Sequence, residues 1–289
     1  MTTMTLAWCC ALSLLAQPEA QTTANPLFAQ LLSPGLALTA ERRLPLPPPT
    51  MADGLDAAGQ RAVIEQLIQG SYSFDDFARP SPVAPHLLKF RELEKLDPLG
   101  RVQIVELWSI AYGSLDNFRR NPEKDVVFKQ RAGSQVHELT ADELAQRQLK
   151  ATASDAFEEN YTYSSFEIFD KVQLSGTNHT VLTRTPESIV VAIEIDTRFN
   201  GDAKFANAWR AVMRAGAQDV TLGEPQPYQG FGSYFKVTKL REPAGALFCE
   251  YHLIFLEPQG WFNGANLLRS KLPIAVQTEV RNFRRELKP

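Results

Sequence analysis

Isoleucine or valine occupies every second position from Ile189 to Ile195, and this is the clearest period-two pattern in the chain. Successive side chains of a strand point to opposite faces, so the pattern predicts a β-strand with one buried face. The same criteria predict strands over 86–93, 102–112, 165–175, 179–185, 188–196, 217–223, 231–241 and 245–256. The turn residues Asp97-Pro98-Leu99-Gly100 favour an antiparallel hairpin between the first two. The core is therefore predicted to be an antiparallel sheet.

Four helices are predicted around these strands, over 56–70, 142–150, 203–215 and 263–287. Asp56 can cap the first helix, and Thr140 with Glu143 has the spacing of a capping box before the second. Pro273 removes a hydrogen bond from the last helix, which predicts a kink or two segments. The predicted fold class is α+β, with a curved antiparallel sheet, helices on one face and a long C-terminal helix.

The C-terminal helix is predicted to be amphipathic. Its apolar positions Val276, Val280, Phe283 and Leu287 recur at helical spacing. The remaining face is predicted to carry the basic residues Arg281, Arg284, Arg285 and Lys288. These cations complement the helix dipole in one interpretation, and bind an anionic surface or ligand in the other.

The N-terminus resembles a cleavable export signal over residues 1–20. The run Leu6 to Ala16 is apolar and uncharged, and it is shorter than the roughly 20 residues that span a bilayer. A basic segment, which usually precedes such a run, is missing, because Arg42 is the first cation. The alternative is a disordered apolar terminus. Export predicts a secreted or periplasmic location with no transmembrane anchor.

Residues 21–52 are predicted to be a flexible linker, because prolines 45, 47, 48 and 49 favour extended polyproline geometry. The remainder, 53–289, is predicted to be one α+β domain, with two halves, 53–150 and 151–289, as the alternative.

Cleavage of the signal leaves Cys249 as the lone cysteine, which excludes an intramolecular disulfide. The formal charge of −3 argues against a nucleic-acid partner.

The sequence does not match any of the tested catalytic motifs in full. The chain has no phosphate-binding GxxxxGK loop and no GxSxG nucleophile elbow. His137-Glu138 begins a zinc-protease motif, but Ala141 stands where its second histidine belongs. The sequence therefore predicts no catalytic residue, no metal site and no cofactor.

Glu250 and His252 form one candidate pair. They lie two positions apart on a predicted strand, so both side chains point to one face. If that face lines a cavity, the pair could bind a metal or transfer a proton. The alternative is a hydrogen-bonded pair on a half-exposed sheet.

Two loops rich in aromatic residues form the other candidate site. One contains Trp261 and Phe262 between a strand and the last helix, and the other contains Tyr228 and Phe231. Aromatic residues in loops often anchor ligands or partners. The alternative is that they close the end of the core.

The order of elements resembles the helix-grip architecture of START and Bet v 1-like proteins over roughly 56–287. In that architecture a curved antiparallel sheet wraps around a long C-terminal helix, and an apolar cavity lies between the sheet and the helix. Pro273 and the insert near 200–216 depart from it. The segment with Glu-Tyr-His and Gly-Trp-Phe-Asn-Gly-Ala-Asn also resembles a family of uncharacterised exported bacterial proteins, which supports export and implies no activity.

Two classes of function follow as hypotheses. The first is an exported, non-catalytic protein that binds a small apolar or amphipathic ligand or an envelope protein. The second is a hydrolase-type or metal-dependent enzyme that uses Glu250 and His252. A third hypothesis, a structural or assembly protein, predicts self-association through the Trp261-Phe262 loop.

Overall fold

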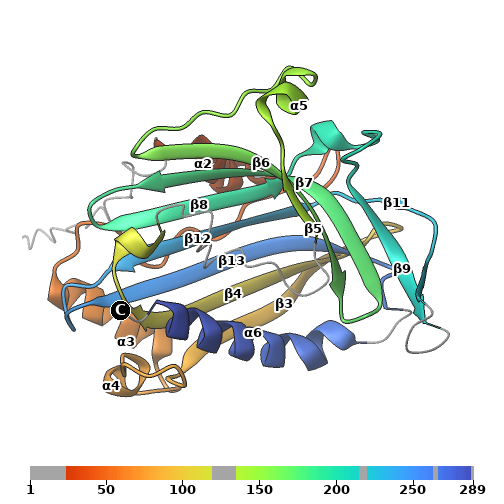
Figure 1. Ribbon diagram of the computed structural model, residues 1–289. Helices are drawn as coiled ribbons and strands as arrows, with labels where there is room; N and C mark the ends of the chain where they lie inside the picture. The colour runs from red at the N-terminus through yellow and green to blue at the C-terminus, as the bar shows by residue number, and fades with distance from the viewer. Residues whose placement is uncertain (1–23, 119–134, 215–219, 263–265, 288–289) are drawn as a thin grey trace, which may run out of the picture.

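A large open antiparallel sheet dominates the computed structural model, which describes residues 24–118, 135–214, 220–262 and 266–287 (Figure 1). The main path of the sheet is β10–β9–β7–β8–β12–β13–β4–β3. Strand β6 pairs with β7 and β5, and β11 pairs with β9. The strands are β3 (His86–Leu96), β4 (Gly100–Tyr112), β5 (Gln135–Glu138), β6 (Phe157–Ile168), β7 (Val172–Arg184), β8 (Ser188–Ile195), β9 (Ala208–Arg214), β10 (Val220–Leu222), β11 (Gln226–Pro227), β12 (Phe231–Lys239) and β13 (Ala246–Pro258).

The described helices and short helical turns lie around this sheet. They are α2 (Pro26–Gln30), η1 (Leu31–Gly35), α3 (Ala57–Ile68), α4 (Phe74–Phe77), η2 (Leu115–Phe118), α5 (Ala141–Ala145), η3 (Thr197–Phe199) and α6 (Leu267–Glu286). A small separate sheet joins β1 (Leu36–Ala37) to β2 (Arg43–Leu44). The predicted α+β class with an antiparallel sheet and a C-terminal helix is confirmed.

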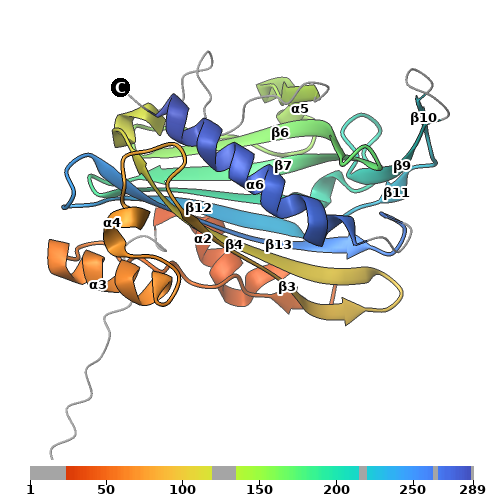
Figure 2. The same ribbon diagram turned by 90° about the horizontal axis from the view of Figure 1, so that it is seen from below.

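Helix α6 covers one face of the sheet, which we call the helix face (Figure 2). Leu268 packs there against Val105 and Phe255, and Leu287 packs against Ala111 and Cys249. The helix runs without a break across Pro273, so the predicted division into two segments is wrong. None of the described helices has the length and apolar character that crossing a membrane requires.

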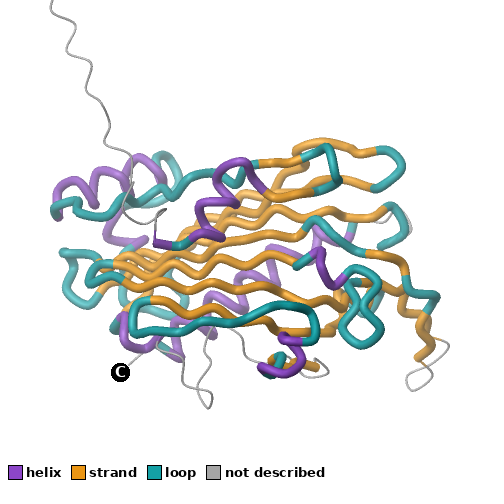
Figure 3. The backbone as a smooth tube through the Cα atoms, turned by 90° about the horizontal axis from the view of Figure 1, so that it is seen from above, coloured by secondary structure: helices purple, strands orange, loops and turns teal. Residues whose placement is uncertain are grey.

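The opposite face is covered by residues 24–53, which we call the strap, and by α3 and α4 (Figures 2 and 3). Leu27, Phe28 and Leu31 pack against Val190 and Tyr234, and Met51 packs beside the α3 cluster. The strap takes in most of the predicted linker, 21–52. The prediction that this segment is a flexible tether is wrong for the strap, because its apolar side chains form part of the core.

The hairpin β3–β4 and the helix α3 follow the sequence prediction closely. Gly100 lies at the turn of the hairpin with φ +147°, a conformation that favours glycine. Asp56 caps α3 by accepting the N–H of Gly59 at 2.7 Å. Thr140 and Glu143 form the expected capping box, although α5 ends at Ala145 rather than near residue 150.

Two further sequence predictions of secondary structure are wrong. The predicted helix over 203–215 is instead a turn followed by β9, which pairs with β7, β10 and β11. The predicted strand over 165–175 contains the turn between β6 and β7, where Phe169 and Asp170 have positive φ angles of 51° and 57°. At 208–214 pairing with the distant strand β7 outweighs the local pattern, whereas at 165–175 the apolar pattern runs across a tight turn between consecutive strands. Of the predicted strand over 217–223, residues 217–219 lie outside the described residues, and β10 covers Val220–Leu222.

Candidate functional site

A pocket of about 400 Å³ lies where β9, β11 and the end of β13 meet. The two predicted aromatic loops meet at this pocket, together with the β3–β4 turn. Its lining residues are Pro98, Leu99, Asn200, Trp209, Gln226, Pro227, Tyr228, Gln229, Leu256, Pro258, Gln259 and Gly260. The volume falls in the range of about 300–1,000 Å³ that is typical of small-molecule sites.

Backbone hydrogen bonds hold the Tyr228 loop against the end of β13. The N–H of Leu256 donates to the carbonyl of Gly230 at 2.7 Å, and the Tyr228 hydroxyl donates to the carbonyl of Leu256 at 3.1 Å. The backbone N–H of Tyr228 donates to the carbonyl of Asn207 at 3.2 Å. The loop is therefore held on both sides by hydrogen bonds within the protein.

The aromatic side chains form a stack behind the pocket. The rings of Tyr228 and Trp261 lie 5.5 Å apart at 27°, and Phe262 meets Trp261 edge-on at 5.9 Å. Tyr228, Trp261 and Phe262 are all buried, and half-buried Phe231 packs into the same cluster. The structure thus brings the four predicted aromatic residues together, but only Tyr228 lines the pocket.

Most lining residues of the pocket were not selected by the sequence analysis. Trp209 is half-buried, and the amide side chains of Gln226 and Gln259 are exposed. Trp209 was expected on a helix, whereas on β9 it pairs with Gln226 of β11. The amide residues carry no sequence signal of their own, because glutamine and asparagine are common on any surface.

Among the described residues, no charged side chain lines the pocket, although the carboxylate of Asp97, which is not a lining residue, accepts from the Gln259 amide at 3.4 Å. Burial raises the pKa of Tyr228, so its phenol stays neutral and acts as a hydrogen-bond donor. The pocket offers prolines, Leu99 and the Trp209 ring as an apolar wall, with four side-chain amides around it. Such a lining suits an uncharged molecule that carries hydrogen-bonding groups.

Glu250 and His252 point to the same face, as predicted, but that face is covered by the strap. Glu250 is 0% exposed and His252 is 1% exposed. The Glu250 carboxylate accepts the backbone N–H of Thr50 at 2.6 Å and that of Met51 at 3.3 Å. The expected half-exposed surface is therefore wrong, and the carboxylate anchors the strap to β13.

Other side chains of the sheet bind the strap beside Glu250. Lys236, which is 0% exposed, donates to the carbonyl of Met51 at 2.6 Å and pairs with Asp53 at 2.9 Å. Trp108 donates to the Thr50 hydroxyl at 2.9 Å. Four strands meet here, because Ser188 of β8 also donates to Asp53 at 2.7 Å.

His252 lies between two carboxylates in this buried polar cluster. Its Nε2 is 3.6 Å from a Glu250 oxygen and its Nδ1 is 3.8 Å from a Glu106 oxygen. The imidazole stacks on Tyr234 at 4.7 Å and meets Trp108 edge-on at 5.4 Å. Neither ring nitrogen makes a hydrogen bond within the described residues. Within the same residues, no group of three His, Cys, Asp or Glu side chains could hold a metal ion.

Arg284 does not belong to the basic face that was predicted for the C-terminal helix. It is buried, and it donates to the carbonyls of Ile110 at 2.7 Å and Pro85 at 2.7 Å and also to the carbonyl of Ala84. Burial lowers the pKa of Arg284 to about 10. Its role is therefore to join α6 to β4 and the segment before β3. Lys288 lies outside the described residues.

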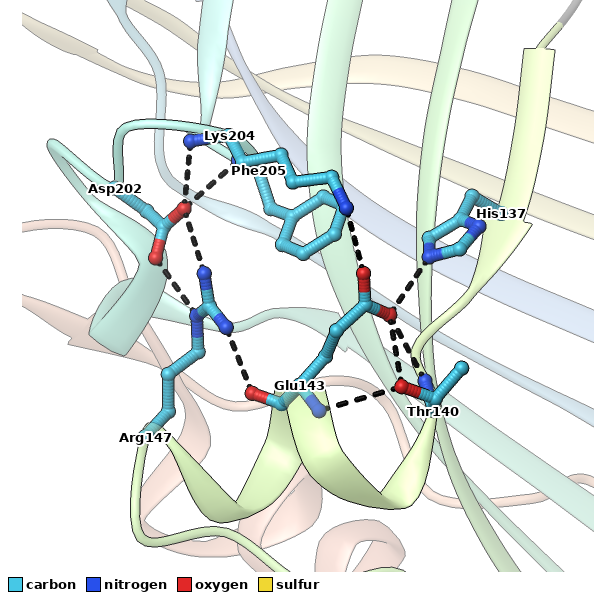
Figure 4. A network of polar contacts seen from close by, with 7 residues as sticks. All are labelled: His137, Thr140, Glu143, Arg147, Asp202, Lys204 and Phe205. Carbon is cyan, nitrogen blue, oxygen red and sulfur yellow. Dashed lines mark hydrogen bonds and ion pairs between the residues drawn. The ribbon is translucent and has the colours of Figure 1, made fainter.

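A separate polar network joins α5 to the loop before β9 (Figure 4). Glu143 accepts from Lys204 at 2.7 Å and lies 2.8 Å from His137, while Arg147 pairs with Asp202 at 2.7 Å. These hydrogen bonds lower the pKa of both carboxyl groups, Glu143 and Asp202, to about 2. His137, excluded above as part of a zinc-protease motif, is thus a partner of a carboxylate that caps a helix.

The network predicts acid-dependent loosening of α5. Because the folded-state pKa values are lowered from 4.5 for Glu143 and 3.8 for Asp202, the stabilisation is present above those values and is lost as pH falls towards 2. We expect amide hydrogen-exchange protection of α5 to fall in this window before that of β13 does. The Glu143→Gln variant should already show reduced α5 protection at pH 6. Protection of α5 that persists to pH 2 in the wild-type chain would contradict the assignment.

Comparisons with known proteins give only distant likenesses. No protein-family model and no curated protein matches the chain. Among solved structures, the lipid transfer and protein localization domain of human StarD13 (DLC2) is similar at a TM-score of 0.37, with 10% identity over 70% of this chain and 91% of that chain. The S-type phycobiliprotein lyase CPES from Guillardia theta gives a TM-score of 0.13 and 8% identity over 66% of this chain and 96% of that one. The weak resemblance to START domains is confirmed, and no argument about function rests on it.

Proposed function

We propose that this protein is a non-catalytic binding protein for an uncharged, amphipathic small molecule, held in the pocket between β9, β11 and the end of β13. The pocket itself is the observation that carries the proposal, since it combines suitable volume, an apolar wall and several amides. Binding sites of this kind are mostly apolar, with a few polar groups that orient the ligand.

The alternative, an enzyme that uses Glu250 and His252, has less support. Both side chains are buried beneath the strap, and Glu250 already accepts two backbone N–H groups. A general base must reach the proton that it removes from a substrate. These contacts favour a structural role for the pair.

Export remains part of the proposal. The predicted leader, residues 1–20, lies outside the described residues, and Asn25, a few residues after the expected cleavage position near Ala20, is part of the packed strap. The Asn25 amide donates to the carbonyl of Val181 at 3.1 Å. N-terminal sequencing of the mature protein from a periplasmic or secreted fraction tests this. Recovery of an intact Met1 from the cytoplasm would contradict export.

A charge placed on the apolar wall should abolish ligand binding. Leu99 lines the pocket and is 42% exposed, so Leu99→Asp should be tolerated in folding but would leave a carboxylate facing an uncharged ligand. We expect at least tenfold weaker binding of decanoylglycerol or octyl glucoside, two neutral amphiphiles, measured by calorimetry below their critical micelle concentrations.

Val83→Asp is the matched control, because Val83 is also an exposed apolar residue, at 57%, and lies outside the pocket. It should bind as the wild type does. Equal affinities of the wild-type chain and Leu99→Asp would show that the amphiphiles bind elsewhere and would remove the pocket from the proposal.

A further inference from the structure

We propose that the ligand of this pocket is a neutral saccharide whose ring packs against Trp209. This inference rests on the proposed function and specifies its ligand. Three properties of the pocket carry it: a fixed aromatic ring, amides from separate segments around it, and a lining that has no charged side chain among the residues that the structure describes.

Trp209 is held in place by close packing. A Cβ atom added to Gly260 would lie 2.7 Å from Cη2 of the Trp209 indole, so glycine at this position lets the backbone approach the ring. The indole is half-buried and lines the pocket, and the β9–β11 pairing fixes its backbone opposite Gln226. A rigid aromatic ring offers a flat apolar surface at little cost in conformational entropy. The C–H face of a pyranose ring is complementary to such a surface.

The amides come from separate parts of the chain. They belong to Asn200 after η3, Gln226 on β11, Gln229 after β11 and Gln259 after β13. Gln229 is oriented by the strap, because its Nε2 donates to the carbonyl of Leu38 at 2.8 Å. Each amide combines a donor and an acceptor, and a sugar hydroxyl also does both. The Asn200 amide donates to Gln229 and the Gln259 amide donates to Asp97, each at 3.4 Å, so these contacts orient the two side chains. The Gln226 amide and the Gln259 oxygen are left to match the hydroxyl groups at the edge of a saccharide.

The uncharged character of the described lining residues separates the candidate ligands. A phosphorylated or acidic ligand would lose hydration without gaining an ionic partner among the lining residues. A purely apolar ligand would cover the exposed amide of Gln226, which has no side-chain hydrogen bond within the described residues, and burying such a group unpaired costs about 1–3 kcal/mol. A neutral saccharide avoids both penalties, because it is apolar on its ring face and polar at its edge.

The test uses the full mature chain on an array of neutral and acidic glycans, followed by calorimetry with each neutral glycan that binds and with its uronic acid or phosphorylated counterpart. We expect saturable binding of a neutral glycan, and binding of the acidic counterpart at least tenfold weaker. Trp209→Ala should lower the affinity for the neutral glycan at least tenfold. Gln226→Ala and Gln259→Ala should each lower it severalfold. Ile274→Ala, on the exposed side of α6, should leave binding unchanged.

The outcomes distinguish this inference from the proposed function. If decanoylglycerol binds in the pocket and no neutral glycan does, the saccharide inference is overturned and the proposed function stands. If no neutral probe binds, both fail. Equal binding of acidic glycans, or full affinity in Trp209→Ala, also overturns the inference. Should Trp209→Ala unfold, the two glutamine variants carry the test, because both side chains are exposed.

Discussion

Replacing Glu250 by alanine is expected to lower the free energy of unfolding by about 3–5 kcal/mol, the range found when one partner of a buried ionic cluster is removed. The Thr50 and Met51 N–H groups would lose their acceptor, and His252 would lose the carboxylate that lies 3.6 Å from its Nε2. Urea unfolding followed by tryptophan fluorescence measures the change, since Trp108 lies beside the cluster.

The matched control is Glu94→Ala. Glu94 also binds the strap, through Arg42 at 2.6 Å, but this ion pair is on the surface, with the two side chains 47% and 25% exposed. Exposed pairs contribute about 0–1 kcal/mol, so the loss should be several times smaller than for Glu250. Similar losses in the two variants would show that burial beneath the strap does not set the contribution of Glu250.

Replacing Arg284 by methionine is expected to destabilise the protein by about 2–4 kcal/mol, because the buried carbonyls of Ile110 and Ala84 and the partly buried carbonyl of Pro85 lose their donor together. Methionine keeps much of the apolar volume, so the loss reports mainly on hydrogen bonding. Arg284→Lys should recover only part of it, since an ammonium group cannot reproduce the planar fork of the guanidinium.

Arg285→Met provides the control, because Arg285 is the next residue of α6 and is exposed. Its unfolding free energy should change by less than about 0.5 kcal/mol. If Arg285→Met were as destabilising as Arg284→Met, the effect would come from helix charge, and the buried contacts of Arg284 would not explain it.

Elements with strong local signals could be predicted from the sequence. The hairpin of β3 and β4 has turn residues and alternating strands, and α3 has a capping aspartate at Asp56. The region 203–215 shows the limit of such signals. Phe205, Trp209 and Val212 fall near helical spacing, yet pairing with β7 and β11 makes residues 208–214 a strand.

The candidate site could be predicted only in part. Tyr228, Phe231, Trp261 and Phe262 stand out in the sequence as aromatic loop residues, and the structure places them in one cluster. The amides of the pocket have no local signal, because they come from segments as far apart as Asn200 and Gln259. Likewise, nothing near Glu250 in the sequence indicates that Thr50 and Met51 cover it.

The sequence by itself determined the class of this protein, because alternating apolar residues and turn residues specify an antiparallel sheet through local geometry. It also placed Glu250 and His252 on one face, since side chains two apart on a strand share a side. Only the tertiary structure decided that the strap closes over that face and that Trp209 and the amides form a pocket. Both depend on contacts between residues distant along the chain, and the periodicity of a single segment carries no information about them.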